Sequence, residues 1–150
     1  MSASQSWITR SGEETAALGA RLLGTPPPEQ APCRIVTLAG ELGSGKSTFA
    51  RGVLRALGAT GAIKSPSYTL LETYELPGVH VVHLDLYRLK DPDELEHLGL
   101  ADYHRPGQLW LIEWPENGAG RLPPADVEFR FLIAPDGHRI ERIETFRANK

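Results

Sequence analysis

Polar and apolar positions in the first third of the chain predict a helix, a connection, a strand and a second helix. Residues 11–24 begin with Ser11, continue with two glutamates and an apolar stripe, and end with a glycine, which is the pattern of a capped amphipathic helix. Residues 25–32 contain three consecutive prolines, which allow neither a helix nor a paired strand. Residues 34–39 are an apolar β-type run, and residues 48–57 carry apolar positions at helical spacing.

The rest of the chain is dominated by β-type runs. The predicted strands cover residues 69–76, 79–85, 109–114, 127–133 and 139–146. Turn residues Pro77 and Gly78 separate the first pair, and residues 135–137 separate the last pair, so we expect two antiparallel hairpins. A short helix is predicted from Asp91, with Pro92 in its first turn. This order predicts a single α/β domain over residues 1–150, with three α/β/α layers, a mixed central sheet and antiparallel hairpin additions.

Composition places the chain among soluble globular proteins and argues against a membrane segment. Its 150 residues are 41% hydrophobic and 23% charged, and no apolar run approaches the length of a membrane span. The first residues lack the basic and apolar regions of a signal peptide, and the single Cys33 cannot form an intrachain disulfide. We therefore expect a cytoplasmic location.

The net charge is acidic and unevenly distributed. A formal charge of −3 and a pI near 5.9 argue against independent binding of DNA or RNA. Residues 72–102 hold eight acidic side chains against two basic ones, a net charge of −6. Such a segment repels phosphate backbones and is able to attract a basic protein surface.

The motif that carries chemistry is a P-loop at residues 40–47. These residues read GELGSGKS, matching G-x-x-x-x-G-K-[ST], and they lie between the predicted strand 34–39 and the predicted helix 48–57. The loop N–H groups and the positive end of the helix dipole point at one place, which makes an anion site. Lys46 is expected to reach the β- and γ-phosphates, and the Ser47 hydroxyl to ligate Mg²⁺. The pattern predicts binding of a nucleoside triphosphate.

Two acids are candidates for the second anchor of a metal ion. Asp85 ends one apolar strand and Glu113 nearly ends another, where buried strands emerge at the ligand-binding edge of a sheet. Either acid fits the metal-anchor role, and the other would orient the attacking water or hold the metal through water. Trp114 follows Glu113 closely enough for a contact with adenine to be considered, and residues 64–69 are rich in hydroxyls where P-loop proteins carry a segment that senses the γ-phosphate.

Several larger nucleotide-binding classes are excluded by missing motifs. No D-x-x-G and no N-K-x-D follows the P-loop, so a Ras-like guanine reader has no support. Nothing resembles the signature of an ABC transporter, and the chain is too short for an AAA+ module.

Five segments of the chain together resemble the TsaE (YjeE) family of small bacterial ATPases. They are Gly40-ELGSGKST-Phe49 with Arg51-Gly52, Lys64-SPSYTL-Leu71, His83-LDLYR-Leu89, Asp91-PDELEHLG-Leu100 with Asp102-Tyr103, and Leu111-IEWP-Glu116. The resemblance runs from about residue 11 to residue 146. It implies a P-loop NTPase fold and a role in forming N6-threonylcarbamoyladenosine beside the tRNA anticodon. Members of the family bind and hydrolyse ATP with Mg²⁺, weakly alone, and act with a complex of TsaB and TsaD. TsaD transfers the group to tRNA, so tRNA is contacted through the complex.

The resemblance also implies roles for individual residues. The expected phosphate contacts are Gly43, Ser44, Gly45, Lys46, Ser47 and Thr48. Ser47 and Glu113 are the expected Mg²⁺ ligands, and Asp85 is the second acid at the metal, required for hydrolysis; with Lys46, the two acids are the expected catalytic residues. The helix start from Ser11 to Thr15 is expected near the adenine. The family's nucleotide-responsive segment corresponds to residues 65–67. Ser47 and Ser67 stand where the family commonly has Thr, and each keeps the hydroxyl.

Two other hypotheses fit the P-loop alone. A free-standing phosphotransferase would pass phosphate from ATP to a metabolite without a protein partner. A nucleotide-gated interaction module would bind ATP without hydrolysing it, so that changing Asp85 or Glu113 would leave the activity of its assembly intact while Lys46→Ala abolished it.

Overall fold

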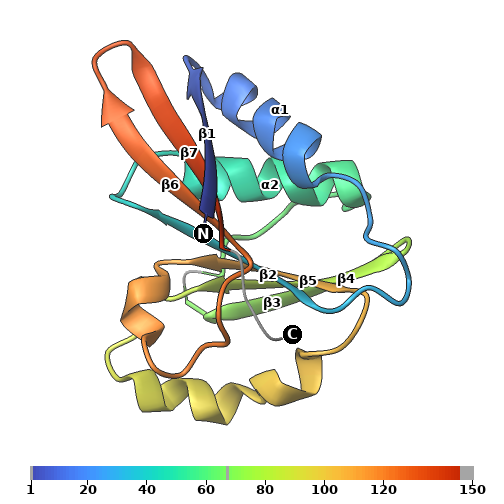
Figure 1. The fold of residues 1–150 in the computed structure, drawn as a ribbon. Coiled ribbons are helices and arrows are strands. Elements are labelled where there is room, and N and C mark those ends of the chain that lie inside the picture. The colour runs from blue at the N-terminus through green and yellow to red at the C-terminus, as the bar shows by residue number, and fades with distance from the viewer. Residues whose placement is uncertain (1, 67, 146–150) are drawn as a thin grey trace.

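The computed structural model describes residues 2–66 and 68–145, which form a seven-stranded mixed sheet with helices on both faces (Figure 1). The strand order is β1-β7-β6-β2-β5-β4-β3. In chain order the elements are β1 (Ser2–Thr9), α1 (Gly12–Leu23), β2 (Arg34–Gly40), α2 (Lys46–Leu57), β3 (Leu71–Leu76), β4 (Val79–Asp85), η1 (Pro92–Leu98), η2 (Leu100–Tyr103), β5 (Gln108–Glu113), η3 (Pro115–Gly118), β6 (Val127–Ala134) and β7 (Gly137–Thr145).

The centre of the sheet is parallel and its flanks are antiparallel. Strand β2 pairs in parallel with β5 and β6, and β5 pairs in parallel with β4. Strand β4 returns antiparallel along β3, and β7 returns antiparallel along β6, so both predicted hairpins are present. The predicted α/β class, with a mixed sheet and antiparallel additions, is confirmed.

The two faces of the sheet are covered differently. Helices α1 and α2 lie together on one face (Figure 1), over a core that includes Phe49, Val36 and Phe129. The short 3-10 helices η1, η2 and η3 cover the other face, over a second core around Trp110 and Leu84. Buried residues run along both faces of the central strands, as expected of parallel strands with helical layers on each side.

Helices α1 and α2 approach each other closely at two glycines. A Cβ atom at Gly52 would lie 2.1 Å from the carbonyl oxygen of Ala16, and one at Gly19 would lie 2.5 Å from the carbonyl oxygen of Phe49. The absence of side chains at these positions therefore sets the distance between the two backbones. The start of α1 therefore lies beside the start of α2, where a Cβ atom built on Gly12 would lie 3.8 Å from the Thr48 methyl group.

Strand β1 was not predicted. Residues 2–9 are mostly Ser, Gln and Ala, and they lack the alternating apolar pattern that identifies a strand. The strand pairs with β7 from Ser2 to Thr9, and Trp7 packs against the core beneath α1 and α2. Backbone pairing with a strand more than 120 residues away therefore overrides a weak local preference.

Other differences concern the ends of elements. The helix predicted from Asp91 is a 3-10 helix, and Asp91 caps it as expected by accepting a hydrogen bond from the N–H of Asp93 at 3.0 Å. Strand β3 begins at Leu71 rather than at residue 69, because Leu70 has a φ of 68° and breaks the extended run. Strand β5 ends at Glu113 because Trp114 has a φ of 57°. The predicted end of the last strand at residue 146 lies outside the described residues. No described helix combines the length and the apolar character that spanning a membrane requires.

Candidate functional site

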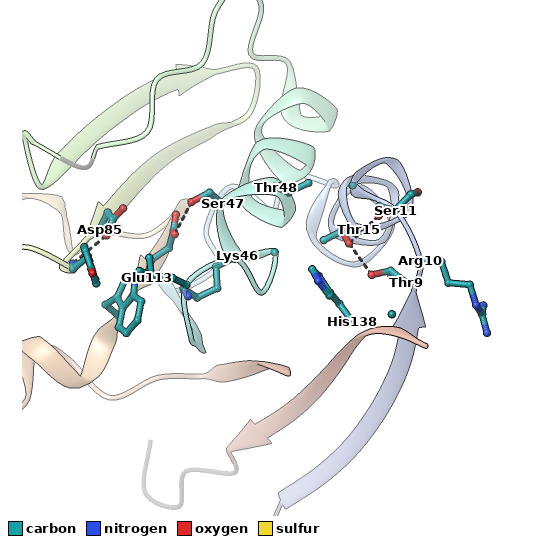
Figure 2. A pocket seen from close by; sticks show the side chains of 17 residues that line it. Thr9, Arg10, Ser11, Thr15, Lys46, Ser47, Thr48, Asp85, Glu113 and His138 are labelled. Atoms are coloured by element: carbon teal, nitrogen blue, oxygen red, sulfur yellow. Dashed lines mark hydrogen bonds between the residues drawn. The ribbon is translucent and has the colours of Figure 1, made fainter. Parts of the chain in front are cut away.

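A cavity of about 450 Å³ opens at the carboxyl ends of β2, β4 and β5. The P-loop forms its floor, the ends of β4 and β5 form one wall, and the starts of α1 and β7 form the other (Figure 2). In open α/β sheets this edge is where ligands bind, since the strand ends and the loops that follow them converge there. The cavity therefore lies where the sequence places the nucleotide site.

The P-loop adopts a backbone that only glycine accommodates readily. Gly43 and Gly45 have φ angles of 77° and 107°, in the left-handed region. A Cβ atom on Gly40 would lie 2.5 Å from the carbonyl oxygen of Phe131 on the neighbouring strand. Helix α2 begins directly after Gly45, so its first N–H groups face the cavity. The loop and the helix end together present N–H donors and the positive end of a helix dipole, an arrangement that suits an anion.

Lys46 lies at the cavity with its ammonium group in contact with the P-loop itself. The residue is 5% exposed, and Nζ donates hydrogen bonds to the carbonyl oxygens of Gly40 and of Glu41, the latter at 3.0 Å. Nζ also lies 4.3 Å from the centroid of the Trp114 ring, a cation–π distance. Burial lowers the pKa of Lys46, while the carboxylates around it, Glu113 foremost, act in the opposite direction.

Glu113 is the most constrained acid at the site. It is 1% exposed, and its two carboxylate oxygens have different partners. Oε1 accepts a hydrogen bond from the Ser47 hydroxyl at 2.9 Å, and Oε2 lies 2.7 Å from Nε2 of His83. The strand end, the first turn of the P-loop helix and strand β4 thus converge on one carboxylate.

Asp85 lies beside Glu113 on the neighbouring parallel strand. The β4–β5 register aligns Asp85 with Glu113, so the two acids emerge side by side at the cavity (Figure 2). Burial raises the pKa of Asp85, and the nearby Glu113 adds to this effect. The N–H of Tyr87 donates to Oδ1 of Asp85 at 3.0 Å and lowers the pKa of that carboxyl again.

The donor set of the site fits Mg²⁺ bound together with a phosphate. Ser47 offers a hydroxyl and Glu113 a carboxylate, 2.9 Å apart, with Asp85 on the adjacent strand. Among the described residues no group of three or more His, Cys, Asp and Glu side chains is arranged to hold a metal by protein ligands alone. Mg²⁺ rarely uses such a cage, since it keeps several waters and binds one or two carboxylates plus phosphate oxygens.

The far end of the cavity is polar and was only partly anticipated. Ser11 caps α1, as predicted, by accepting a hydrogen bond from the N–H of Glu14 at 3.1 Å, and it lines this end of the cavity. Thr9 and Thr15 join their hydroxyls at 2.7 Å beside it. Arg10 and His138 also line the cavity (Figure 2). The sequence offered no signal for Thr9, Arg10 or His138, because their proximity depends on the unpredicted pairing of β1 with β7.

Nearly all of the predicted site residues line the same cavity. Those that do are Ser11, Gly43, Gly45, Lys46, Ser47, Thr48, Asp85 and Glu113. Ser44 does not: it is fully buried beneath the loop, and its Oγ has no hydrogen-bond partner among the described residues. Trp114 also lines the cavity, and Nζ of Lys46 lies over its ring. In the segment 64–69 the described residues do not line the cavity, and Ser67 lies outside the described residues.

Comparisons with known proteins agree on one family. The family model for the threonylcarbamoyl adenosine biosynthesis protein TsaE matches residues 9–141. A tRNA threonylcarbamoyladenosine biosynthesis protein TsaE from Haemophilus influenzae is 47% identical over 109 residues, covering 73% of this chain and 69% of the relative. The protein of the same name from Bacillus subtilis is 32% identical over 133 residues, covering 89% and 80%. The crystal structure of YdiB from B. subtilis superposes with a TM-score of 0.78 at 26% identity, covering 97% of this chain and 88% of that one.

Proposed function

The chain belongs to the TsaE family of threonylcarbamoyl adenosine biosynthesis proteins, and from that premise we propose that it is a Mg²⁺-dependent ATPase of this pathway. Family membership carries a role in tRNA threonylcarbamoyladenosine biosynthesis. The further proposal is that the chain binds ATP in the cavity and hydrolyses it in association with a complex of TsaB and TsaD. The observation that carries it is the Ser47–Glu113 contact at 2.9 Å at the head of a P-loop, with Asp85 aligned beside it.

Binding of the phosphates is assigned to the P-loop and the start of α2. N–H groups of the loop and of the first turn of α2 would hold the phosphates at the cavity, and Lys46 would turn its ammonium group from the carbonyl oxygens of Gly40 and Glu41 towards the β- and γ-phosphates. Burial lowers the pKa of Lys46 because it disfavours the charged ammonium group. A phosphate beside this group would stabilise its charge. The Thr9–Thr15 end of the cavity is left for the nucleoside.

Hydrolysis is assigned to the metal position and the acid beside it. When bound, Mg²⁺ would neutralise negative charge that develops on the phosphates during hydrolysis. Ser47 and Glu113 hold this position, since their oxygens already lie within hydrogen-bonding distance of each other. Asp85 orients the attacking water, because its carboxylate is buried at the cavity wall beside Glu113. We assign the direct ligand role to Glu113 and the water-orienting role to Asp85.

Association with a partner complex is supported by the distribution of charge. Asp91, Asp93, Glu94, Glu96 and Asp102 are exposed on and around η1 and η2, on the sheet face opposite α1 and α2. Arg121 pairs with Asp93 and Glu96, which leaves the surface acidic on balance. A surface of this charge suits a basic protein partner better than a direct contact with tRNA, so we propose that tRNA is reached through the TsaB–TsaD complex.

The test is ATP hydrolysis by the purified chain, alone and with a TsaB–TsaD complex. Slow turnover that rises with the complex is expected, and both Lys46→Ala and Glu113→Ala are expected to abolish the rise. Glu128→Ala, a half-exposed acid outside the cavity on β6, serves as the matched control and should behave as wild type. Turnover that ignores the complex would refute the partner proposal, and normal turnover in Lys46→Ala would refute the site.

A further inference from the structure

His83 is a buried histidine whose only described side-chain hydrogen bond is to the proposed metal ligand. It lies on β4 two residues before Asp85 and is 1% exposed. Its Nε2 lies 2.7 Å from Oε2 of Glu113, and because a carboxylate accepts, Nε2 donates. Its Nδ1 is buried and has no hydrogen-bond partner among the described residues. The contact with Glu113 is therefore the polar interaction that orients this ring.

We propose that His83 is a positioning residue that holds the Glu113 carboxylate in the orientation needed for the metal. This inference rests on the proposed function, in which Glu113 binds Mg²⁺. Oε2 is held by His83 on one side, and Oε1 is therefore presented to Ser47 on the other. The Ser47 hydroxyl and Oε1 of Glu113, which would both bind the metal, are therefore already positioned in the metal-free protein.

The register of the sheet explains why a histidine at this position reaches Glu113. Strands β4 and β5 run in parallel, with His83 opposite Leu111 and Asp85 opposite Glu113. His83 and Glu113 are diagonal neighbours on one face of the sheet, a separation that a long or aromatic side chain bridges. His80 lies on the other side of the same strand and is exposed, so it makes no comparable contact.

Burial makes this hydrogen bond consequential. Glu113 and His83 are each 1% exposed, so the Oε2 oxygen faces a buried side chain rather than solvent. Without His83, one oxygen of a buried carboxylate is left without a donor, and Ser47 can then bond either oxygen. Groups that orient metal ligands in this way typically contribute about 10- to 100-fold to metal affinity. The expected consequence is a weaker metal site with an intact phosphate site.

The experiment measures metal and nucleotide affinity separately in the full chain. Mn²⁺ binding to the protein–ADP complex is followed by electron paramagnetic resonance, and ADP binding in EDTA is followed by calorimetry. His83→Leu removes the donor, whereas His83→Gln places an amide N–H close to the position of Nε2. His80→Leu is the matched control on the same strand. His83→Asn is a second loss variant, since its shorter amide does not reach Glu113. Circular dichroism confirms folding, and His83→Asn takes the place of His83→Leu if the latter does not fold.

The proposal requires a selective and rescuable loss. His83→Leu should bind Mn²⁺ about 10- to 100-fold more weakly, keep its metal-free ADP affinity within about twofold, and be restored by His83→Gln to within about threefold. Unchanged Mn²⁺ affinity in His83→Leu, equal affinities in the Gln and Asn variants, or an equal loss of metal-free ADP binding would each overturn it. Glu113→Gln distinguishes the metal role of Glu113 from the positioning role of His83. If both Glu113→Gln and His83→Leu keep wild-type Mn²⁺ affinity, the metal role of Glu113 is wrong. If Glu113→Gln loses Mn²⁺ affinity and His83→Leu does not, only the role of His83 is wrong.

Discussion

Replacing Gly52 by alanine is expected to destabilise the protein, although alanine normally favours a helix. The new Cβ would lie 2.1 Å from the carbonyl oxygen of Ala16 and 2.7 Å from its carbonyl carbon and Cα. These are backbone atoms, which cannot rotate away, so α1 has to move by about 1 Å to restore a normal contact. Overpacking of this kind costs up to about 3 kcal/mol, while the gain in helix propensity is about 1 kcal/mol. We therefore expect a net loss of about 2 kcal/mol.

Urea denaturation followed by circular dichroism measures the free energy of unfolding in this variant. With an unfolding entropy of about 2.1 cal/mol/K per residue, a loss of about 2 kcal/mol corresponds to a melting temperature about 6 °C lower. Gly12→Ala is the matched control: it makes the same chemical change in α1, but its Cβ would lie 3.8 Å from the Thr48 methyl group. That variant should stay within about 0.5 kcal/mol of wild type. A Gly52→Ala protein as stable as wild type, or as stable as Gly12→Ala, would refute the argument.

Two further predictions concern charged groups in the cavity. Lys46→Ala should weaken ATP binding by about 1.5–3 kcal/mol, or about 10- to 150-fold, because one charge-assisted phosphate contact is lost; calorimetry showing unchanged affinity would contradict the phosphate role. Because burial raises the pKa of Asp85 above 3.8, folding is disfavoured once this carboxyl is ionised, and the penalty disappears as pH falls through 3.8. Asp85→Asn should therefore melt at a higher temperature than wild type at pH 7, with the difference shrinking towards pH 3.5; a difference that widens in acid would show the opposite sign.

The sequence predicted the glycine-rich loop between β2 and α2 because that segment is encoded locally. Residues 40–47 specify the loop almost by themselves, since the glycines, Lys46 and Ser47 lie within one turn of chain. Asp85 and Glu113 were identified by a general rule, because carboxyl ends of neighbouring parallel strands meet at one edge of the sheet. The observed alignment of the two acids on β4 and β5 agrees with that rule.

The other features depend on register and on distant pairing. The polar run 2–9 forms a strand only because β7 offers it a partner, so neither β1 nor the nearness of Thr9 to His138 was visible in the sequence. The contact between His83 and Glu113 similarly depends on which residues of β4 and β5 face each other. The burial of Ser44 beneath its own loop follows from tertiary packing, which a motif does not encode.

Because β1 pairs with β7, the cavity is complete only after residues far apart in the chain have been translated. A ribosome completes the P-loop and α2 before half of the described residues exist, yet the wall that contains Gly137 and His138 is translated near the end of that stretch. Strand β1 is translated long before β7 and has to wait for it before the two can pair, a contact of very long sequence separation that slows folding. A nascent chain therefore carries the whole P-loop before the cavity around that loop is complete.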